Sequence, residues 1–360
     1  MRSICFALLV VCLSAPLFAG DYGAVSTHKI ADGIFLFTTT PYADVGFCGN
    51  VTAVVGDKAV LLFDSGALPE TAQTILGELR KVTPKPVRYL VNSHWHWDHW
   101  GGNEAIAAAF PAVQIITHEK TREMMLEVEP RWNDRGLKQD LPGFISDFEK
   151  RIAAIKAEGA SRERISRAEE RLAVAKNFLQ QKQTLRKTLP NVIFSDSMTV
   201  QLGGREVQIL HAQAITPGDT YVYLPKEKIL VTGDILLNPY PYAIGGTYPQ
   251  EWQSTLNRFV ALQPAWIIPG HGEAMAGKEM AQSNLAMMEK AAAQVKAGKA
   301  QGKSSDETVK AMDAAAIAAK VGVAGDEAVG AFRAYFLEVF VRRAFRELDG
   351  PLGELPDGLQ

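Results

Sequence analysis

The stretch that most constrains this chain is His94–Gly102, which reads HWHWDHWGG. Three of the chain's seven histidines and one aspartate lie within six residues here, and two glycines follow. The preceding VRYLV has the apolar, β-branched composition of a buried strand, so the histidines are predicted to begin where a strand ends. Neutral imidazole and carboxylate are ligands that Zn²⁺ and Fe²⁺ accept. The pattern favours a metal site over a metal-free surface loop, and its spacing suits two adjacent metals better than one.

The rest of the chain alternates strands and helices. Strand-like segments separated by turns run from Gly33 to Asp64, and apolar spacing predicts a helix over 69–81. After the histidines we expect a short helix over 103–109, a strand in VQIIT and a helix from about His118. Strands resume in NVIFSD, MTVQLGG, REVQILHA, YVYLP and KILVTGD, followed by a helix over 249–262 and a short strand in AWIIPGHGE.

Two regions are predicted to be mainly helical. In 143–187 apolar residues recur at helical spacing on both sides of the turn-like EGAS, which predicts an inserted helical hairpin. A solvated arm is favoured for this hairpin, with a lid or a homodimer contact as alternatives. The region 274–360 is predicted to be a helical C-terminal extension, and its last apolar face is expected to pack on the body or on a partner copy. The domain between these ends is 20–273.

The first 19 residues differ from all that follow. Arg2 precedes the apolar run Ile4–Leu13, and small Ala19 precedes Gly20, which predicts a secretory signal peptide over 1–19. The run is too short to span a bilayer and no lipobox follows, so no membrane anchor is expected after cleavage. We therefore expect a periplasmic or secreted protein. Cys48 would be its one remaining cysteine, more typical of a packed residue than of a nucleophile.

The composition excludes some classes of partner. The chain has 47% hydrophobic residues, 22% charged residues and a formal net charge of −2, an ordinary balance for a soluble globular protein. A near-zero charge offers no electrostatic footprint for nucleic acid or an anionic membrane. A small-molecule substrate is the expected partner.

Several segments together carry a family resemblance. HWHWDHWGG, NVTAVVGDKAVLLFDSG, ITPGDTYVYLP, LVTGD and IIPGHG resemble, in this order, the motifs of the metallo-β-lactamase superfamily. The resemblance covers roughly 28–273 without the hairpin, and the layout is similar to the glyoxalase-II-like branch. It implies an α/β (α+β) fold, an αββα sandwich, here with the inserted hairpin and the helical C-terminal tail.

The resemblance also implies two metal sites. The first would use His94, His96 and a third histidine, and the second Asp98, His99 and His271, with Asp234 shared between them. Asp98 is also the candidate catalytic residue. The slot of the third histidine holds Ile215, which cannot bind a metal, so the second site is the favoured one. Zinc, as one or two ions, is the expected cofactor, with iron as an alternative.

Other polar residues near these motifs are weaker candidates. Asp64 is expected to orient a ligand histidine, and Asp219 to cap a turn or support a ligand. Asn238 and Tyr240 are candidate substrate contacts, with an ordinary loop as the alternative. His211 is a disfavoured substitute for the missing histidine. Three tryptophans either wall a pocket or pack behind the loop: Trp95, Trp97 and Trp100.

These inferences predict an exported metal-dependent hydrolase. Metal-bound hydroxide would attack an ester, thioester, lactone or amide, a β-lactam included. One alternative is a binding or scaffold protein of the same fold, catalytically impaired because of Ile215. A second alternative is a mononuclear iron oxygenase. Substrate choice is expected to depend on the hairpin and on three segments taken as loops: 40–49, 130–142 and 238–248.

Overall fold

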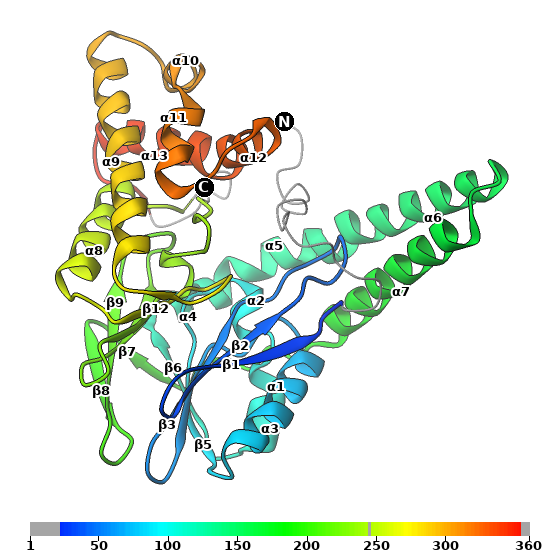
Figure 1. Ribbon diagram of the computed structural model, residues 1–360, viewed down its shortest axis with the longest axis vertical. Helices are drawn as coiled ribbons and strands as arrows, with labels where there is room; N and C mark the ends of the chain where they lie inside the picture. Colours follow the sequence, from blue (N-terminus) through cyan, green and yellow to red (C-terminus); the bar gives the residue numbers. More distant parts are fainter. Residues whose placement is uncertain (1–21, 244–245, 354–360) are drawn as a thin grey trace.

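Two β-sheets packed face to face, with helices on both outer sides, make up the computed structural model (Figure 1). The structure describes residues 22–243 and 246–353, so the predicted signal peptide lies outside the described residues. The first sheet has the order β1 to β7: Val25–Ala31, Ile34–Thr39, Val51–Val55, Val60–Phe63, Val87–Val91, Gln114–His118 and Val192–Phe194. The second has the order β13-β12-β11-β10-β9-β8, from β8 at Ser197–Gln201 through β9 at Glu206–Ala212, β10 at Asp219–Leu224, β11 at Ile229–Val231 and β12 at Trp266–Ile268 to β13 at Met275–Ala276. The predicted αββα sandwich is confirmed.

Apolar side chains from both sheets fill the space between them. Leu61, Phe63 and Val91 from the first sheet and Ile209 and Val222 from the second belong to one buried cluster. Strand β4 is buried at every position, because its other face is covered by α1 (Pro69–Val82) and α3 (Asn103–Ala109). Such two-sided burial explains why these strands read as continuous apolar runs in the sequence.

The outer face of the second sheet carries the C-terminal helices. The helices that follow are α8 (Pro249–Ala261), α9 (Glu279–Ala300), α10 (Ser305–Ala311), α11 (Ala314–Ala318), α12 (Asp326–Phe332) and α13 (Glu338–Glu347), with a 3₁₀ turn at Ala319–Val321 and a π-helical turn at Arg333–Leu337. Phe336 is fully buried, its ring lies 6.2 Å from that of Trp252 in α8, and it shares one apolar cluster with Leu230 and Ile267 of the second sheet. The apolar face predicted for the last helix therefore packs on the body of this chain.

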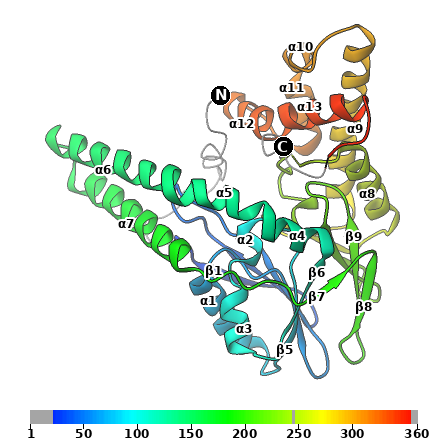
Figure 2. The ribbon, with the colours of Figure 1, turned by 180° about the vertical axis from the view of Figure 1, so that it is seen from behind.

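The inserted hairpin forms as an antiparallel pair of helices that projects from the sandwich (Figures 1 and 2). Helix α6 is Leu141–Ala157 and α7 is Arg162–Thr184, and the Ser161 hydroxyl accepts a hydrogen bond from the backbone N–H of Arg164, which caps α7. The buried residues of α7 all lie in its C-terminal part, next to the body of the protein: Ala175, Phe178 and Lys182. This end of the hairpin is called the root below, and it consists of these three residues with Leu141 and Ile145 of α6.

Three details differ from the sequence predictions. The segment 130–142, predicted as a loop, is helical: α4 (Glu119–Glu127) is followed by α5 (Glu129–Arg135), a π-helical turn at Gly136–Asp140 and the start of α6. Strand β1 was not predicted, and most of its residues are exposed, so it lacks an apolar signature. The second sheet continues past residue 273, because β13 pairs with β12. No helix in the described ranges has the length and apolar character needed to cross a membrane.

Candidate metal centre

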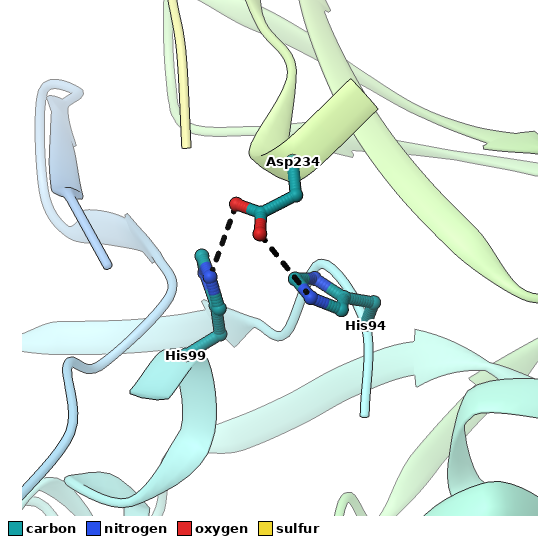
Figure 3. Close-up of side chains that lie close together, drawn as sticks. All are labelled: His94, His99 and Asp234. Atoms are coloured by element: carbon teal, nitrogen blue, oxygen red, sulfur yellow. Dashed lines mark ion pairs between the residues drawn. The ribbon is translucent and has the colours of Figure 1, made fainter. Parts of the chain in front are cut away.

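The predicted ligands meet at one edge of the sandwich, where strands of both sheets end. His94 and His96 lie in the loop after β5, and Asp98 and His99 lie on the short helix α2 (Trp97–Trp100). Asp234 lies on a 3₁₀ turn after β11, and His271 follows β12. Figure 3 shows the Asp234 carboxylate lying between the imidazoles of His94 and His99.

A glycine makes this meeting of strand ends possible. A Cβ atom at Gly270 would lie 2.1 Å from Asp234 Oδ1 and 2.6 Å from the backbone carbon of Gly233. Any side chain at position 270 would displace the Asp234 carboxylate. Glycine is therefore required at position 270, because the segment after β12 passes close to the turn that carries Asp234.

His99 Nε2 is the hub of the cluster. It lies 3.2 Å from Asp98 Oδ2, 3.1 Å from Asp234 Oδ1 and 3.2 Å from His271 Nε2. His271 Nε2 is 3.0 Å from Asp98 Oδ2, and His94 Nε2 is 3.7 Å from the other oxygen of Asp234. Two groups have all their ligand atoms within 4.8 Å of one another: His94, His99 and Asp234, and Asp98, His99 and His271.

His96 belongs to neither of these groups. Its Nδ1 lies 2.6 Å from His94 Nε2, and the residue is partly exposed where His94 is buried. The structure thus brings five of the six predicted ligands into the two groups and places His96 beside them.

One buried carboxylate sets the proton positions of two ligand histidines. Asp64 is fully buried, and its Oδ2 accepts hydrogen bonds from His99 Nδ1 at 2.8 Å and from the Ser93 hydroxyl at 2.8 Å. Since that hydroxyl donates to Asp64, it accepts from His94 Nδ1, 2.9 Å away. Both imidazoles therefore carry their proton on Nδ1 and direct an Nε2 lone pair at the cluster. The sequence suggested Asp64 for this role, whereas Ser93 was missed.

The donor set fits a divalent cation. Asp98 Oδ2 and Asp234 Oδ1 are buried and accept no hydrogen bond from any described residue, although imidazole nitrogens lie close to both. With His99 protonated on Nδ1, its Nε2 faces these oxygens lone pair to lone pair. Buried polar atoms rarely remain unsatisfied, and a cation between them satisfies all of these lone pairs at once. Imidazole and carboxylate donors suit zinc.

In the chain alone, the electrostatics favour a second proton on His99, at the place that the cation would take. Burial lowers the pKa of His99, but Asp234, Asp98 and Asp64 outweigh it and hold that pKa well above its usual value. Burial raises the pKa of Asp98, but His99 and His271 outweigh it and hold that pKa well below its usual value. Burial lowers the pKa of His96 to about 4. The carboxylates thus attract positive charge to the cluster, and a divalent cation provides it in place of a proton.

The segment that holds Ile215 is fixed by Asp219. The buried Asp219 carboxylate accepts hydrogen bonds from the backbone N–H groups of Ala214, Ile215 and Thr216 and from the Thr216 hydroxyl. Burial raises the pKa of Asp219 to about 7 although these hydrogen bonds oppose it. Asp219 therefore organises the loop, in agreement with its structural interpretation.

Neither Ile215 nor its suggested substitute joins the cluster. Ile215 is 2% exposed and belongs to the apolar core shared with the C-terminal helices. His211 Nε2 donates to the carbonyl of Pro217 at 3.1 Å, and its ring stacks on that of His118 at 3.8 Å. His211 therefore links β9 of the second sheet to β6 of the first, and it belongs to neither ligand group among the described residues.

Asn238 and Tyr240, the two candidate substrate contacts, have different surroundings. The Asn238 backbone N–H donates to the carbonyl of His271 at 3.1 Å and its side chain donates to that of Glu273, so Asn238 braces the segment that carries a ligand. The Tyr240 ring packs on Phe332 in the apolar core. The contacts described for Tyr240 give it no role at the cluster.

Of the three tryptophans, two pack behind the ligand residues and one lies beside the cluster. Trp95 and Trp100 are buried behind the ligand loop, where Trp100 Nε1 donates to the carbonyl of Trp95. Trp97 is partly exposed and lies 6.0 Å from Phe47, whose ring meets the edge of His271 at 5.2 Å between centroids. Phe47 and Trp97 form an aromatic rim beside the partly exposed His96 and His271.

Comparison with known proteins places the chain in a family. Residues 46–271 match the model of the metallo-beta-lactamase superfamily, and the chain belongs to this superfamily. Its members are usually metal-dependent hydrolases. The resemblance to the glyoxalase-II-like branch stays a prediction.

Individual relatives are distant. The linear primary-alkylsulfatase of Pseudomonas sp. (strain ATCC 19151) is 24% identical over 257 residues, which cover 66% of this chain and 44% of that protein. The chain thus spans less than half the length of this curated relative. A metallo-beta-lactamase from Pontibacter korlensis is 17% identical, with a TM-score of 0.51 over 74% of this chain and 99% of that one, which shows the fold. A structure of TMB-1 is 13% identical, with a TM-score of 0.49 over 74% of this chain and 98% of that one.

Proposed function

We propose that this protein is an exported zinc-dependent hydrolase that cleaves an ester, thioester, lactone or amide bond of a small molecule. One observation carries the proposal: ligand atoms of Asp98, His99, Asp234 and His271 converge, with 3.0–3.2 Å between neighbouring atoms, in a largely buried cluster. In the proposal, Asp98, His99 and His271 hold one cation, His94 and His96 contribute to a second, and Asp234 reaches both. Export rests on the signal-like residues 1–19.

The chain's own residues have separate tasks in this proposal. A bound cation supplies Lewis acidity toward the scissile group and an activated water. Asp64 and Ser93 keep the protons of His94 and His99 on the outer ring nitrogens. Phe47 and Trp97 give the approach to the cluster an apolar wall.

The alkylsulfatase relative adds sulfate esters to the substrates worth testing. Purified protein should be analysed for metal content and assayed with carboxylic, thio-, lactone and sulfate esters. We expect bound zinc and turnover that a chelator abolishes and zinc restores. The variant His271→Ala should lose turnover, while His28→Ala, at a strand position outside the cluster, should keep it. Absence of metal together with absence of chelator-sensitive turnover would refute the proposal.

A second candidate is a binding protein of the same fold that no longer catalyses. The observation that favours it is the buried, apolar Ile215 at the position expected for a ligand histidine. The variant Ile215→His separates the two candidates. A gain of one metal equivalent together with new activity favours the binding protein, whereas turnover by the natural chain favours the hydrolase. Metal counting on protein grown with iron tests the remaining alternative, an iron oxygenase.

A further inference from the structure

Lys182 is a buried cation next to the ligand loop. It lies on the last turn of α7, in the root of the hairpin, and is 6% exposed. Its ammonium nitrogen lies 4.3 Å from the centroid of the Trp97 ring and has no hydrogen-bond acceptor among the described residues. Trp97 stands in the sequence between His96 and Asp98. The root of the hairpin therefore places an ammonium group over the Trp97 ring, which is part of the aromatic rim.

Lys182 forms no ion pair among the described residues. The largest opposing charge that acts on it is the buried Glu129, whose carboxylate also forms an ion pair with Lys187. Burial lowers the pKa of Lys182 to about 8, while Glu129 and Asp98 act in the opposite direction. The group therefore remains mostly protonated at pH 7. A buried cation without an ionic partner is costly, and stacking on an indole ring offsets only part of that cost.

The surroundings indicate what would balance this charge. Asp98 lies within electrostatic range of Lys182, but in the proposed hydrolase its charge is neutralised by a bound cation. The surroundings of the Trp97 ring are apolar: its centroid lies 6.0 Å from that of Phe47 in the rim and 5.6 Å from that of Phe178 in the root. An anionic group on an apolar chain, placed against Trp97, would match both the wall and the positive potential behind it.

We propose that Lys182 is a specificity-determining residue that selects anionic amphiphilic substrates, in which a sulfate or carboxylate group is attached to an apolar chain. Lys182 acts through its electric field across the Trp97 ring and does not touch the reacting atoms. This inference rests on the proposed hydrolase and names its substrate class.

The test measures binding by the zinc-loaded full chain with two probes that cannot be hydrolysed. Octanesulfonate carries the anion, and octanol carries the same chain without charge. Binding is followed by calorimetry and by tryptophan fluorescence, since Trp97 lies at the proposed site. The variants are Lys182→Met, which keeps most of the stem, Lys182→Gln as a second neutral form, and Lys182→Arg, which keeps the charge. Lys176→Met is the matched control, because Lys176 lies on the same helix, is exposed and pairs with Glu149.

We expect the neutral variants to weaken octanesulfonate binding about tenfold, which corresponds to about 1.4 kcal/mol. Octanol binding should not change, and Lys182→Arg and Lys176→Met should bind both probes like the natural chain. Equal losses for both probes would show that Lys182 only supports packing, and unchanged sulfonate binding would show that its field does not reach the site. Either result overturns the inference.

The same variants separate this inference from the proposed function. If the charge of Lys182 controls sulfonate binding but no ester is hydrolysed, the hydrolase falls, and the selection of anionic amphiphiles by Lys182 stands for a ligand that is bound and not cleaved. If esters are hydrolysed, Lys182→Met should raise KM for anionic esters alone and leave kcat near its natural value. An equal KM change for neutral esters contradicts the inference and leaves the hydrolase intact.

Discussion

Replacing Asp64 by asparagine should weaken metal binding although Asp64 is not expected to touch the metal. The variant Asp64→Asn keeps the shape of the side chain and replaces one acceptor oxygen by an NH₂ donor. In the natural chain Oδ2 accepts from both His99 Nδ1 and the Ser93 hydroxyl. An amide nitrogen in place of Oδ2 would face both donors, so His99 would move its proton to Nε2, the atom that faces the cluster. With the amide turned the other way, its nitrogen would face the backbone N–H of Ser93, which donates to Oδ1 in the natural chain.

The size of the effect follows from the number of ligands involved. Loss of an outer partner of a ligand histidine typically costs 10- to 100-fold in metal affinity. Asp64 orients His99 directly and His94 through Ser93, so we expect a loss of about 100-fold, or about 2.7 kcal/mol. Ser93→Ala breaks only the link to His94 and should cost about tenfold.

Competition with a chromophoric zinc chelator at pH 7.5 measures both losses. Asp147→Asn is the matched control, because it makes the same chemical change at an exposed position on α6 that pairs with Lys150. Thermal unfolding of the metal-free variants shows whether the fold is retained. Natural zinc affinity in a folded Asp64→Asn variant would refute the assignment of the two tautomers.

Four further outcomes are expected. Gly270→Ala should destabilise the protein by about 1–3 kcal/mol and weaken zinc binding, because its Cβ would meet Asp234 Oδ1 at 2.1 Å; urea unfolding and chelator competition measure these effects. Gly77→Ala, inside α1 with no atom within 4 Å of the added Cβ, should instead stabilise it by about 0.5–1 kcal/mol, and unchanged urea stability would contradict this. Burial and His211 lower the pKa of His118 to about 4, against about 6.5 in the unfolded chain. The folded state then binds fewer protons in this window, so stability should fall as the pH drops from 6.5 to 4, by at most about 3 kcal/mol; His118→Asn, which can still cap α4, should flatten that slope in urea unfolding at several pH values. Chelation should lower the unfolding temperature of the natural chain by an amount that depends on zinc concentration, and an unchanged temperature would argue against a bound metal.

Elements with a strong pattern of their own were predictable from the sequence. The short helix over 103–109 and the strand IFLFTT form over the predicted residues, because burial of their apolar faces agrees with the local pattern. Helix α5 was mistaken for a loop because its short sequence contains Pro130 and is followed by Gly136, two residues that often end helices. Contacts along the chain overrode that signal.

The site was predictable where chemistry is concentrated and not where it depends on distant packing. The histidine cluster by itself predicted a metal site. The contact of His99 with His271, 172 residues later, was expected only through the family resemblance. The burial of Lys182 could not be predicted from the sequence, since a lysine on a charged amphipathic helix is usually solvated. Its burial arises from the way α7 meets Trp97 in three dimensions.

The hairpin joins two parts with different freedom to change. Beyond the root, α7 has no buried residue, and its outer turns face solvent and α6, with the pair between Arg171 and Asp44 as a link to the body. A substitution on the exposed surface of this outer part, such as at Lys176, leaves the contacts of the predicted ligands unchanged. Phe178 and Lys182 contact Trp97 of α2, so a substitution at either position acts on the helix that carries Asp98 and His99. One helix thus combines an exposed outer part with a buried root that supports the candidate metal centre.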